Sequence, residues 1–423
     1  MLNKIKGLIL ENKNPGQTVA KNTFWLFSGQ IFGRLIRVTV VIYAARILGP
    51  ASWGAFSYAM GLAAFMLIFS DIGVSAIVTK EASRNPNLGK KYFSTALAIK
   101  LVLLVAGMTL LIFAAPYLTK IPEAKPLIPI IAFVLLFDSL RNFGFTISRS
   151  QEKMQIEGLN EIATNFFISI LGFAALFLYQ TSKALTVSYA VAVTLGFLLI
   201  ALQLKNYFKD IFNYFDKTLL WPLLKTAWPF ALASSLGAIM INTDMIIIGW
   251  FQNAAEVGFY SAAQRPVQLL YVLPALFAVS LFPNLSRMAK ENKEGFKIFL
   301  KNALKISVAA ALPIAIIGIL FGDIIINLLF GKEYQNAVLP FQILITTVLI
   351  IFPSAIITNA SLAADQQKNF IVFSALGAFG NIILDLVLIP NYGIAGCAIA
   401  TVFTQLIANS FIWWKLEKII IPR

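Results

Sequence analysis

YFSTALAIKLVLLVAGMTLLIFAAPYL is the sequence of residues 92–118, and Lys100 is its only charged residue. An α-helix needs about 20 consecutive apolar residues to cross the hydrocarbon core of a bilayer. This run is therefore long enough to span a membrane. Similar apolar runs recur along the chain between charged breaks and breaks rich in proline or asparagine. The pattern predicts a multi-pass integral membrane protein.

The composition of the whole chain supports the same interpretation. Hydrophobic residues make up 59% and charged residues 13%, and the mean hydropathy is +0.79. A soluble domain carries roughly 25% charged residues to cover its surface, so most of this surface must face lipid. The chain has no histidine and one cysteine, Cys397, which removes the commonest general base and any internal disulfide. With no metalloprotease, P-loop or hydrolase motif either, we expect no catalytic residue, metal or cofactor.

The apolar runs predict an all-α fold of about twelve transmembrane helices in two six-helix lobes around a central cavity. The expected spans are 22–47, 55–79, 92–118, 126–148, 158–180, 184–204, 226–250, 257–283, 303–329, 336–361, 367–389 and 394–415. The expected organisation is a cytoplasmic N-terminal segment (1–21), an N-lobe (22–204), a cytoplasmic linker (205–225), a C-lobe (226–415) and a cytoplasmic tail (416–423).

The distribution of positive charge predicts the orientation. The net charge of +15 does not indicate a nucleic-acid partner, because the lysines and arginines alternate between loops. With the N-terminus inside, the inner segments hold 24 of them and the outer loops 5. This bias follows the positive-inside rule. We therefore expect both termini in the cytoplasm, in the cell membrane.

The two sets of spans also resemble each other in sequence. LGPASWGAFSYA (48–59) and QNAAEVGFYSAA (252–263) align with an offset of 204, which matches Gly54 with Gly258 and Ser57 with Ser261. Six spans in each half give a parallel repeat. Transporters often bind their substrate between such halves.

Several cations lie inside the expected spans, where an ionisable group costs at least about 2.5 kcal/mol. Gln30, Arg34 and Arg37 share one stripe of the first span. Arg265 and Gln268 share a face of the eighth. An arginine fork matches phosphate oxygens, so these residues predict a site for an anionic head group. Lys100, in the third span, is close enough to the cytoplasmic boundary to extend its ammonium to the interface.

The remaining intramembrane charges are candidates either for ion coupling or for internal ion pairs. They are Asp71, Asp138, Arg141, Asp244 and Asp385. The i,i+3 spacing favours a pair between Asp138 and Arg141, and Asp71 could pair with an arginine of the first span. The spacing does not select a coupling residue among Asp71, Asp244 and Asp385.

Four stretches resemble the polysaccharide transporter (Wzx-type flippase) family of the multidrug/oligosaccharidyl-lipid/polysaccharide flippase superfamily. They are AARILGPASWGAFSYA (44–59), VGFYSAAQRPVQLLYVLPALFAVSLFPNLS (257–286), LLFGKEYQNAVLPFQIL (328–344) and NIILDLVLIPNYGIAGCAIAT (381–401). The resemblance implies twelve helices in two lobes around a V-shaped cavity. It also implies transfer of a polyprenyl-diphosphate-linked oligosaccharide from the cytoplasmic to the outer leaflet, with polymerase or glycosyltransferases of the same pathway as candidate partners.

The resemblance places Arg265 in the family-like stretch AAQRPVQ, and it places Arg34 and Arg37 where related flippases have cavity cations. Asp385 departs from the pattern, because a neutral polar residue is expected there. The alternatives are a cation-coupled drug exporter, which should carry carboxylates rather than arginines on the first span, and a peptidoglycan-precursor flippase, which should carry extra helices. A membrane glycosyltransferase or ligase would need larger outer loops, and a non-transporting membrane scaffold is a further alternative.

Overall fold

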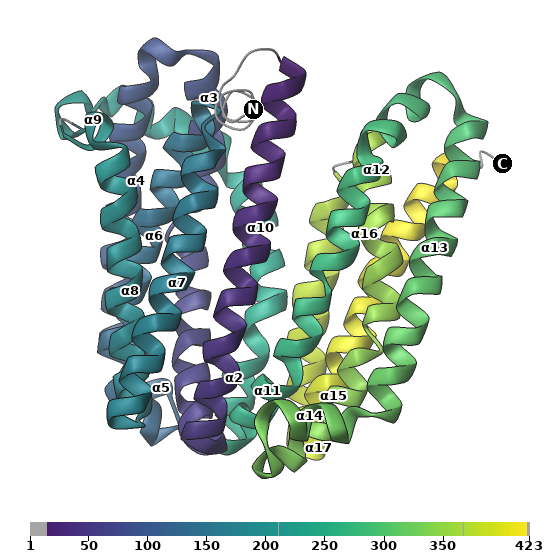
Figure 1. Ribbon diagram of the computed structural model, residues 1–423. Helices are drawn as coiled ribbons and strands as arrows, with labels where there is room; N and C mark the ends of the chain where they lie inside the picture. The colour runs from purple at the N-terminus through teal and green to yellow at the C-terminus, as the bar shows by residue number, and fades with distance from the viewer. Residues whose placement is uncertain (1–14, 210, 367, 421–423) are drawn as a thin grey trace, which may run out of the picture. The chain divides into compact units, whose positions relative to one another are not determined.

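The structure is a computed structural model that describes residues 15–209, 211–366 and 368–420, and every regular element within these ranges is a helix (Figure 1). The first half contains α2 (Pro15–Phe69), α3 (Val74–Arg84), α4 (Gly89–Thr109), α5 (Ala115–Leu118), α6 (Ile128–Ser150), α7 (Met154–Tyr179), α8 (Ser182–Gln203) and α9 (Lys205–Phe208). The second half contains α10 (Leu220–Phe251), α11 (Ala254–Leu270), α12 (Val272–Glu291), α13 (Lys293–Leu320), α14 (Gly322–Phe330), α15 (Val338–Ile345), α16 (Val348–Ala363) and α17 (Asn369–Ile420). Short 3-10 or π segments occupy Pro86–Leu88, Leu110–Ala114, Pro122–Leu127, Ile211–Tyr214, Lys217–Leu219 and Lys332–Ala337.

The predicted multi-span helical membrane fold is confirmed. Among the described helices, 8 are long and apolar enough to cross a membrane, or 9 if the bent pair α2–α3 is one span. Two of the helices, α2 and α17, each join two expected spans across a glycine. Gly49 in α2 has φ +69° and Gly393 in α17 has φ +58°, a region that glycine enters without a Cβ clash. The count of twelve spans stays a prediction.

Large apolar side chains point outward along the helices. Phe177 is 78% exposed, Leu328 72% and Val102 70%. Such surfaces are rare on a soluble monomer and are expected where the solvent is lipid.

Several helices begin after a polar residue that caps them, in regions where the sequence pattern predicts a break between spans. Thr181 Oγ1 accepts from the Ala184 N–H at 3.2 Å, and Asn253 Oδ1 accepts from the Glu256 N–H at 3.1 Å. Asn292 Oδ1 accepts from the Gly295 N–H at 2.8 Å. These caps satisfy amide groups that a helix leaves unpaired at its N-terminus.

The chain divides into two compact units. Unit 1 comprises residues 1–48 and 62–235, and unit 2 comprises 49–61 and 236–423. Residues 49–61, which include the start of the second expected span, belong to unit 2, and the segment 205–235, which includes the expected linker and the start of the seventh expected span, belongs to unit 1. The bounds of the expected lobes stay a prediction. The linker joins unit 1 because Ile211 and Leu223 are buried in its hydrophobic core, together with Val78 and Phe93.

Each unit has its own apolar core. In unit 1 the core involves α3, α4, α6 and α8, and in unit 2 it involves α12, α13, α16 and α17. Buried residues at the centre of the second core include Ile356, Ala360 and Ile412. The polar side chains described below lie between helices of a single unit.

Candidate functional site

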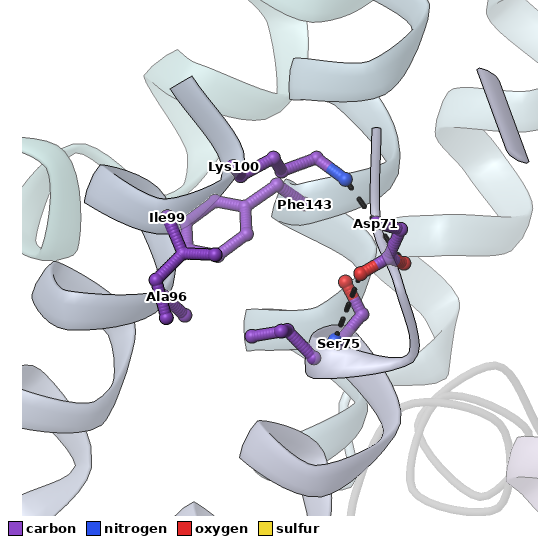
Figure 2. Close-up of a pocket in the computed structure, with 7 residues that line it drawn as sticks. Asp71, Ser75, Ala96, Ile99, Lys100 and Phe143 are labelled. Carbon is purple, nitrogen blue, oxygen red and sulfur yellow. Dashed lines mark hydrogen bonds and ion pairs between the residues drawn. The ribbon is translucent and has the colours of Figure 1, made fainter. Parts of the chain in front are cut away.

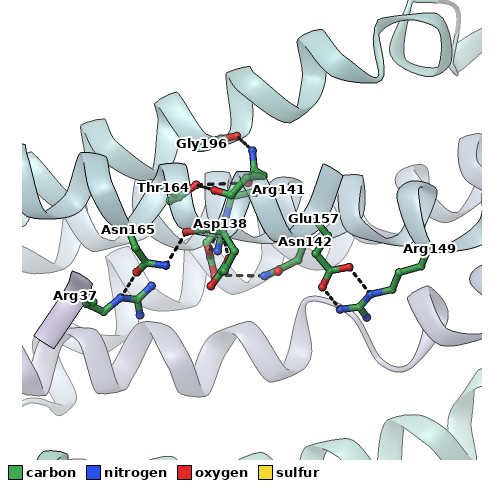
Figure 3. Close-up of polar contacts among 11 residues, drawn as sticks. Arg37, Asp138, Arg141, Asn142, Arg149, Glu157, Thr164, Asn165 and Gly196 are labelled. Atoms are coloured by element: carbon green, nitrogen blue, oxygen red, sulfur yellow. Dashed lines mark hydrogen bonds and ion pairs between the residues drawn. The ribbon is translucent and has the colours of Figure 1, made fainter. Parts of the chain in front are cut away.

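The arginines of the first span lie in unit 1. Arg37 Nε donates to Asn165 Oδ1 at 2.6 Å, and Asn165 Nδ2 donates to the Glu161 backbone oxygen at 2.8 Å (Figure 3). Gly33 permits this approach of α2 to α7, since a Cβ there would lie 2.7 Å from Asn165 Nδ2. Arg34 is exposed, and no polar side chain in the described part of the chain contacts it. Both guanidiniums therefore keep an uncompensated charge among these residues.

Arg141 on α6 has the opposite environment. Its side chain is 5% exposed, and its guanidinium lies 2.8 Å from Asp138 Oδ1 and 2.6 Å from Glu161 Oε2 (Figure 3). Asp138 and Arg141 thus form the pair that their spacing favours. Glu161, which sequence reasoning did not single out, adds a second carboxylate to the same cation. Two charge-assisted contacts in a buried place indicate a structural role for Arg141.

Lys100 and Asp71 form a further pair in unit 1. Lys100 Nζ lies 4.0 Å from Asp71 Oδ2, and the lysine side chain is 4% exposed (Figure 2). The expectation that Lys100 extends to the interface was wrong. Asp71 could have paired with an arginine of the first span, but it lies beside Lys100. The cause is local, because the chain turns sharply between α2 and α3 and brings Asp71 against α4.

Arg265 lies on α11 in unit 2. Its Nε donates to Ser261 Oγ at 3.0 Å, and its guanidinium carbon lies 4.9 Å from the centre of the Trp53 ring. A guanidinium over an indole face is a favourable cation–π contact that leaves the positive charge in place. Gln268 is partly exposed one turn further along α11, whereas Gln30 on α2 is exposed.

Unit 2 also brings together two carboxylates that the sequence only marked separately. Asp244 on α10 and Asp385 on α17 lie with Cys397 such that their ligand atoms are all within 4.8 Å of one another, and all three residues are buried. Asp244 Oδ2 accepts from the Tyr260 hydroxyl at 2.5 Å and from Thr401 Oγ1 at 3.3 Å. Asp385 is fully buried, and neither of its oxygens has a hydrogen-bond partner in the described chain.

This carboxylate cluster carries more negative charge than its neighbours balance. Among the described residues, no lysine or arginine forms an ion pair with Asp244 or Asp385. Two ionised carboxylates cannot satisfy each other, since each only accepts hydrogen bonds. A proton or a small cation between the two carboxylates would supply the missing positive charge. Cys397 and Thr401 are four residues apart and therefore lie on one face of α17. This spacing could have indicated from sequence that both face the carboxylate cluster.

The comparisons with known proteins concern the family and the fold separately. Residues 19–289 match the model of a family described as polysaccharide biosynthesis protein. A putative O-antigen transporter of Shigella flexneri is 24% identical over 95% of this chain and 98% of its own length. A probable low-salt glycan biosynthesis flippase of Haloferax volcanii is 24% identical over 90% of this chain and 80% of its own. The solved structure of the lipid II flippase MurJ in an inward closed conformation superposes with a TM-score of 0.76 at 19% identity, covering 93% of this chain and 87% of that one.

Proposed function

This chain belongs to the polysaccharide biosynthesis protein family, and we propose that it translocates a polyprenyl-diphosphate-linked oligosaccharide from the cytoplasmic to the outer leaflet. Relatives that cover nearly the whole chain carry the names of O-antigen transporter and glycan flippase. The substrate is an anion with a sugar chain and a long apolar tail. It needs membrane-embedded cations whose charge is still free to bind phosphate oxygens. We propose a non-enzymatic transporter that works by alternating access.

The observation that carries the proposal is the contrast between two groups of cations in unit 1. Arg141 and Arg149 each contact a carboxylate at 2.8 Å or less, and Lys100 lies 4.0 Å from one. Arg37 instead contacts a neutral amide, and Arg34 contacts no described polar side chain. A cation in a span is costly unless something compensates it. A diphosphate, which guanidinium groups bind in a bidentate manner, is the compensating group that we propose.

The same contrast argues against a drug exporter for organic cations. Such a substrate would be repelled by Arg34 and Arg37. A carboxylate on the first span would be expected in their place.

The decisive experiment scores lipid-linked oligosaccharide on each leaflet in a flippase-null strain that expresses variants of this chain. Arg34→Ala and Arg37→Ala should each reduce outer-leaflet substrate by at least about tenfold, the effect of about 1.4 kcal/mol in the transport barrier. Arg84→Ala is the matched control, because Arg84 has a 64% exposed side chain at 3.8 Å from Glu81. Full transport by both span variants at normal expression would remove the proposal.

The Asp244–Asp385 cluster supports a second part of the proposal, which is coupling of transport to a cation. Carboxylate and hydroxyl oxygens are the ligands that hard cations prefer, and Asp244, Asp385 and Thr401 supply them. We assign this cluster, rather than Asp71 or Asp138, to a proton or sodium ion. The bound ion would neutralise the negative charge of Asp244 and Asp385, with which no described lysine or arginine forms an ion pair.

We also propose that both termini lie in the cytoplasm. The proposal is supported by the excess of lysine and arginine in the inner segments, 24 against 5 in the outer loops. A reporter fusion after residue 120 should report the outside of the membrane, and one after residue 300 should report the cytoplasm. The reverse assignment, or the same side for both, would contradict the orientation.

A further inference from the structure

A groove lies between α7 and α8 in unit 1, beside the turn that joins these two neighbouring helices (Figure 1). Its volume of about 550 Å³ is within the range of about 300–1,000 Å³ that is typical of small-molecule sites. Leu176 and Leu185 are buried on the inner side of the two helices. The walls of the groove carry three alanines, which are Ala174, Ala175 and Ala184. The hollow exists because these methyl groups do not reach far enough to fill the space between the helices.

The body of the groove is apolar. Besides the alanines, its walls are formed by the aliphatic side chains of Leu171, Leu178, Val187 and Val191. Ser188 also lines it, but the Ser188 hydroxyl donates to the Leu185 backbone oxygen at 2.7 Å and so keeps its proton within its own helix. A water molecule needs about two to four polar partners to stay in a cavity, and these walls do not supply them. A hydrocarbon chain is therefore the occupant that the body of the groove favours.

One end of the groove is polar and positively charged. Tyr179, Thr181 and Lys183 line this end, at the turn between α7 and α8. Tyr179 is 69% exposed, and tyrosine is enriched at the level of lipid head groups. Lys183 is also exposed, and none of the residues with described positions forms an ion pair with it. An ammonium group without a counter-charge at the end of an apolar groove complements an anionic head group that is joined to a hydrocarbon chain.

We infer that this groove binds one anionic phospholipid, with an acyl chain along the aliphatic walls and the phosphate beside Lys183. The proposed orientation places Lys183 at the outer surface, where it is one of five cations in the outer loops, so the lipid belongs to the outer leaflet. A zwitterionic phospholipid fits the same walls, but it carries a cation of its own that competes with Lys183 for the phosphate. The lysine therefore selects lipids with a net negative charge.

This lipid site is separate from the arginines to which we assign the transported substrate. Arg37 contacts Asn165 on α7, whereas the groove begins at Leu171 and continues to the end of that helix. The bound lipid would contact α7 and α8 together and hold them at their common turn. Any ligand that binds only the folded state stabilises it, so the lipid has a structural role that does not depend on transport.

Native mass spectrometry of the purified full chain tests the inference, after release from nanodiscs that hold equal amounts of phosphatidylglycerol and phosphatidylcholine with identical acyl chains. The wild type should retain one phosphatidylglycerol with a preference of about fivefold over phosphatidylcholine, which is the contribution of one lysine beside an anionic head group. Lys183→Gln should retain the two lipids equally, because the apolar walls are unchanged. Lys125→Gln is the matched control, since Lys125 is an exposed lysine of another expected outer loop and does not line the groove. No substrate takes part, so a failure here is distinct from a failure of the proposed transport.

A second variant tests the apolar walls. Ala174 is exposed on the wall of the groove, so the ring of Ala174→Phe should fill the groove without entering the core. Retention of phosphatidylglycerol should fall by about tenfold, a factor that lost burial of two methylene groups is enough to produce. Ala106→Phe, at an exposed position of α4 outside the groove, is the matched control.

Three results would overturn the inference. Equal retention of the two phospholipids by the wild type would show unselective lipid on the surface only. An unchanged preference in Lys183→Gln would show that another group selects the head group. Undiminished retention in folded Ala174→Phe would place the lipid elsewhere, and the Lys183→Gln result decides alone if Ala174→Phe does not fold.

Discussion

Ser57 and Ser261 are hydrogen-bonded to each other through their hydroxyls at 3.0 Å, although 204 residues separate them. The same offset relates Gly54 to Gly258, and these glycines also meet. A Cβ on Gly54 would lie 1.7 Å from the Ala254 oxygen, and one on Gly258 would lie 2.1 Å from the Pro50 oxygen. Matched residues that touch their own counterparts are what a two-fold axis produces. The internal repeat that the sequence predicts thus has a contact point at which its two copies cross.

A cysteine pair at this contact should form a disulfide. In a Cys397→Val background, Ser57→Cys with Ser261→Cys should cross-link on mild oxidation, because the two hydroxyl oxygens are already 3.0 Å apart. We expect transport to persist in the cross-linked protein, because both serines lie in unit 2 and the bond joins two segments of the same unit. Gel mobility measures the cross-link, and leaflet-resolved transport measures its effect. Each single cysteine variant serves as a control, and loss of transport on oxidation that reduction restores would contradict the expectation.

A methyl group at the glycine crossing should destabilise the protein. The Cβ of Gly258→Ala would meet backbone oxygen, which cannot move aside as a side chain can. Overpacking of this kind costs about 1–3 kcal/mol or more, visible as a lower midpoint of thermal unfolding in detergent. Gly107→Ala is the matched control within a helix, because nothing lies within 4 Å of its added Cβ. An equal fall in the unfolding midpoint for the two substitutions would show that the packing at Gly258 is no tighter than at Gly107.

The spans could be predicted from sequence because lipid demands a long apolar run for each of them. Their ends were predicted less well, because α13 begins at Lys293 after the Asn292 cap, whereas the expected span begins at 303. The pair of Asp138 and Arg141 was also within reach, because i,i+3 neighbours meet on one helix without help from the fold.

Contacts between distant spans were not predictable in the same way. Arg37 meets Asn165 across 128 residues, and Asp244 meets Asp385 only because α10 and α17 pack together. A single sequence marks each polar residue as costly in the membrane, but it does not say which partner offsets the cost. Asp71 lies beside Lys100 at the turn that includes Ile72 and Gly73. The turn residues of SDIG (70–73) were a signal for this break that the span prediction did not use.

Neutralising Asp385 should remove coupling to a cation. Asp385→Asn keeps the shape of the side chain but removes one of two buried carboxylates, so the cluster loses half of its negative charge and one of its cation ligands. In proteoliposomes, acceleration of transport by a sodium or proton gradient should fall by about tenfold, a typical coupling between two sites. Saturable binding of radioactive sodium to the purified protein reads the same site directly. Asp323→Asn, at a carboxylate that accepts from Asn327 Nδ2 at 2.8 Å on the exposed surface, should leave both readings unchanged. Gradient stimulation that persists in Asp385→Asn would exclude this cluster as the coupling site.

Removing Arg141 should unfold unit 1 rather than alter its transport chemistry. Arg141→Gln leaves Asp138 and Glu161, whose side chains are 26% and 25% exposed, without the buried guanidinium that both contact. Breaking a fully buried pair costs about 3–5 kcal/mol, which is the upper limit of the expected loss here. Adding Glu161→Gln to Arg141→Gln should recover part of the loss, because one of the stranded charges is then gone. The measurement is the thermal midpoint of each purified variant, with Arg84→Gln as the surface control that should change stability by less than about 1 kcal/mol. If the double variant were less stable than Arg141→Gln alone, Glu161 would have a favourable role of its own. Glu161 would then stabilise the protein independently of Arg141, and the ion pair would not be what holds α6 to α7.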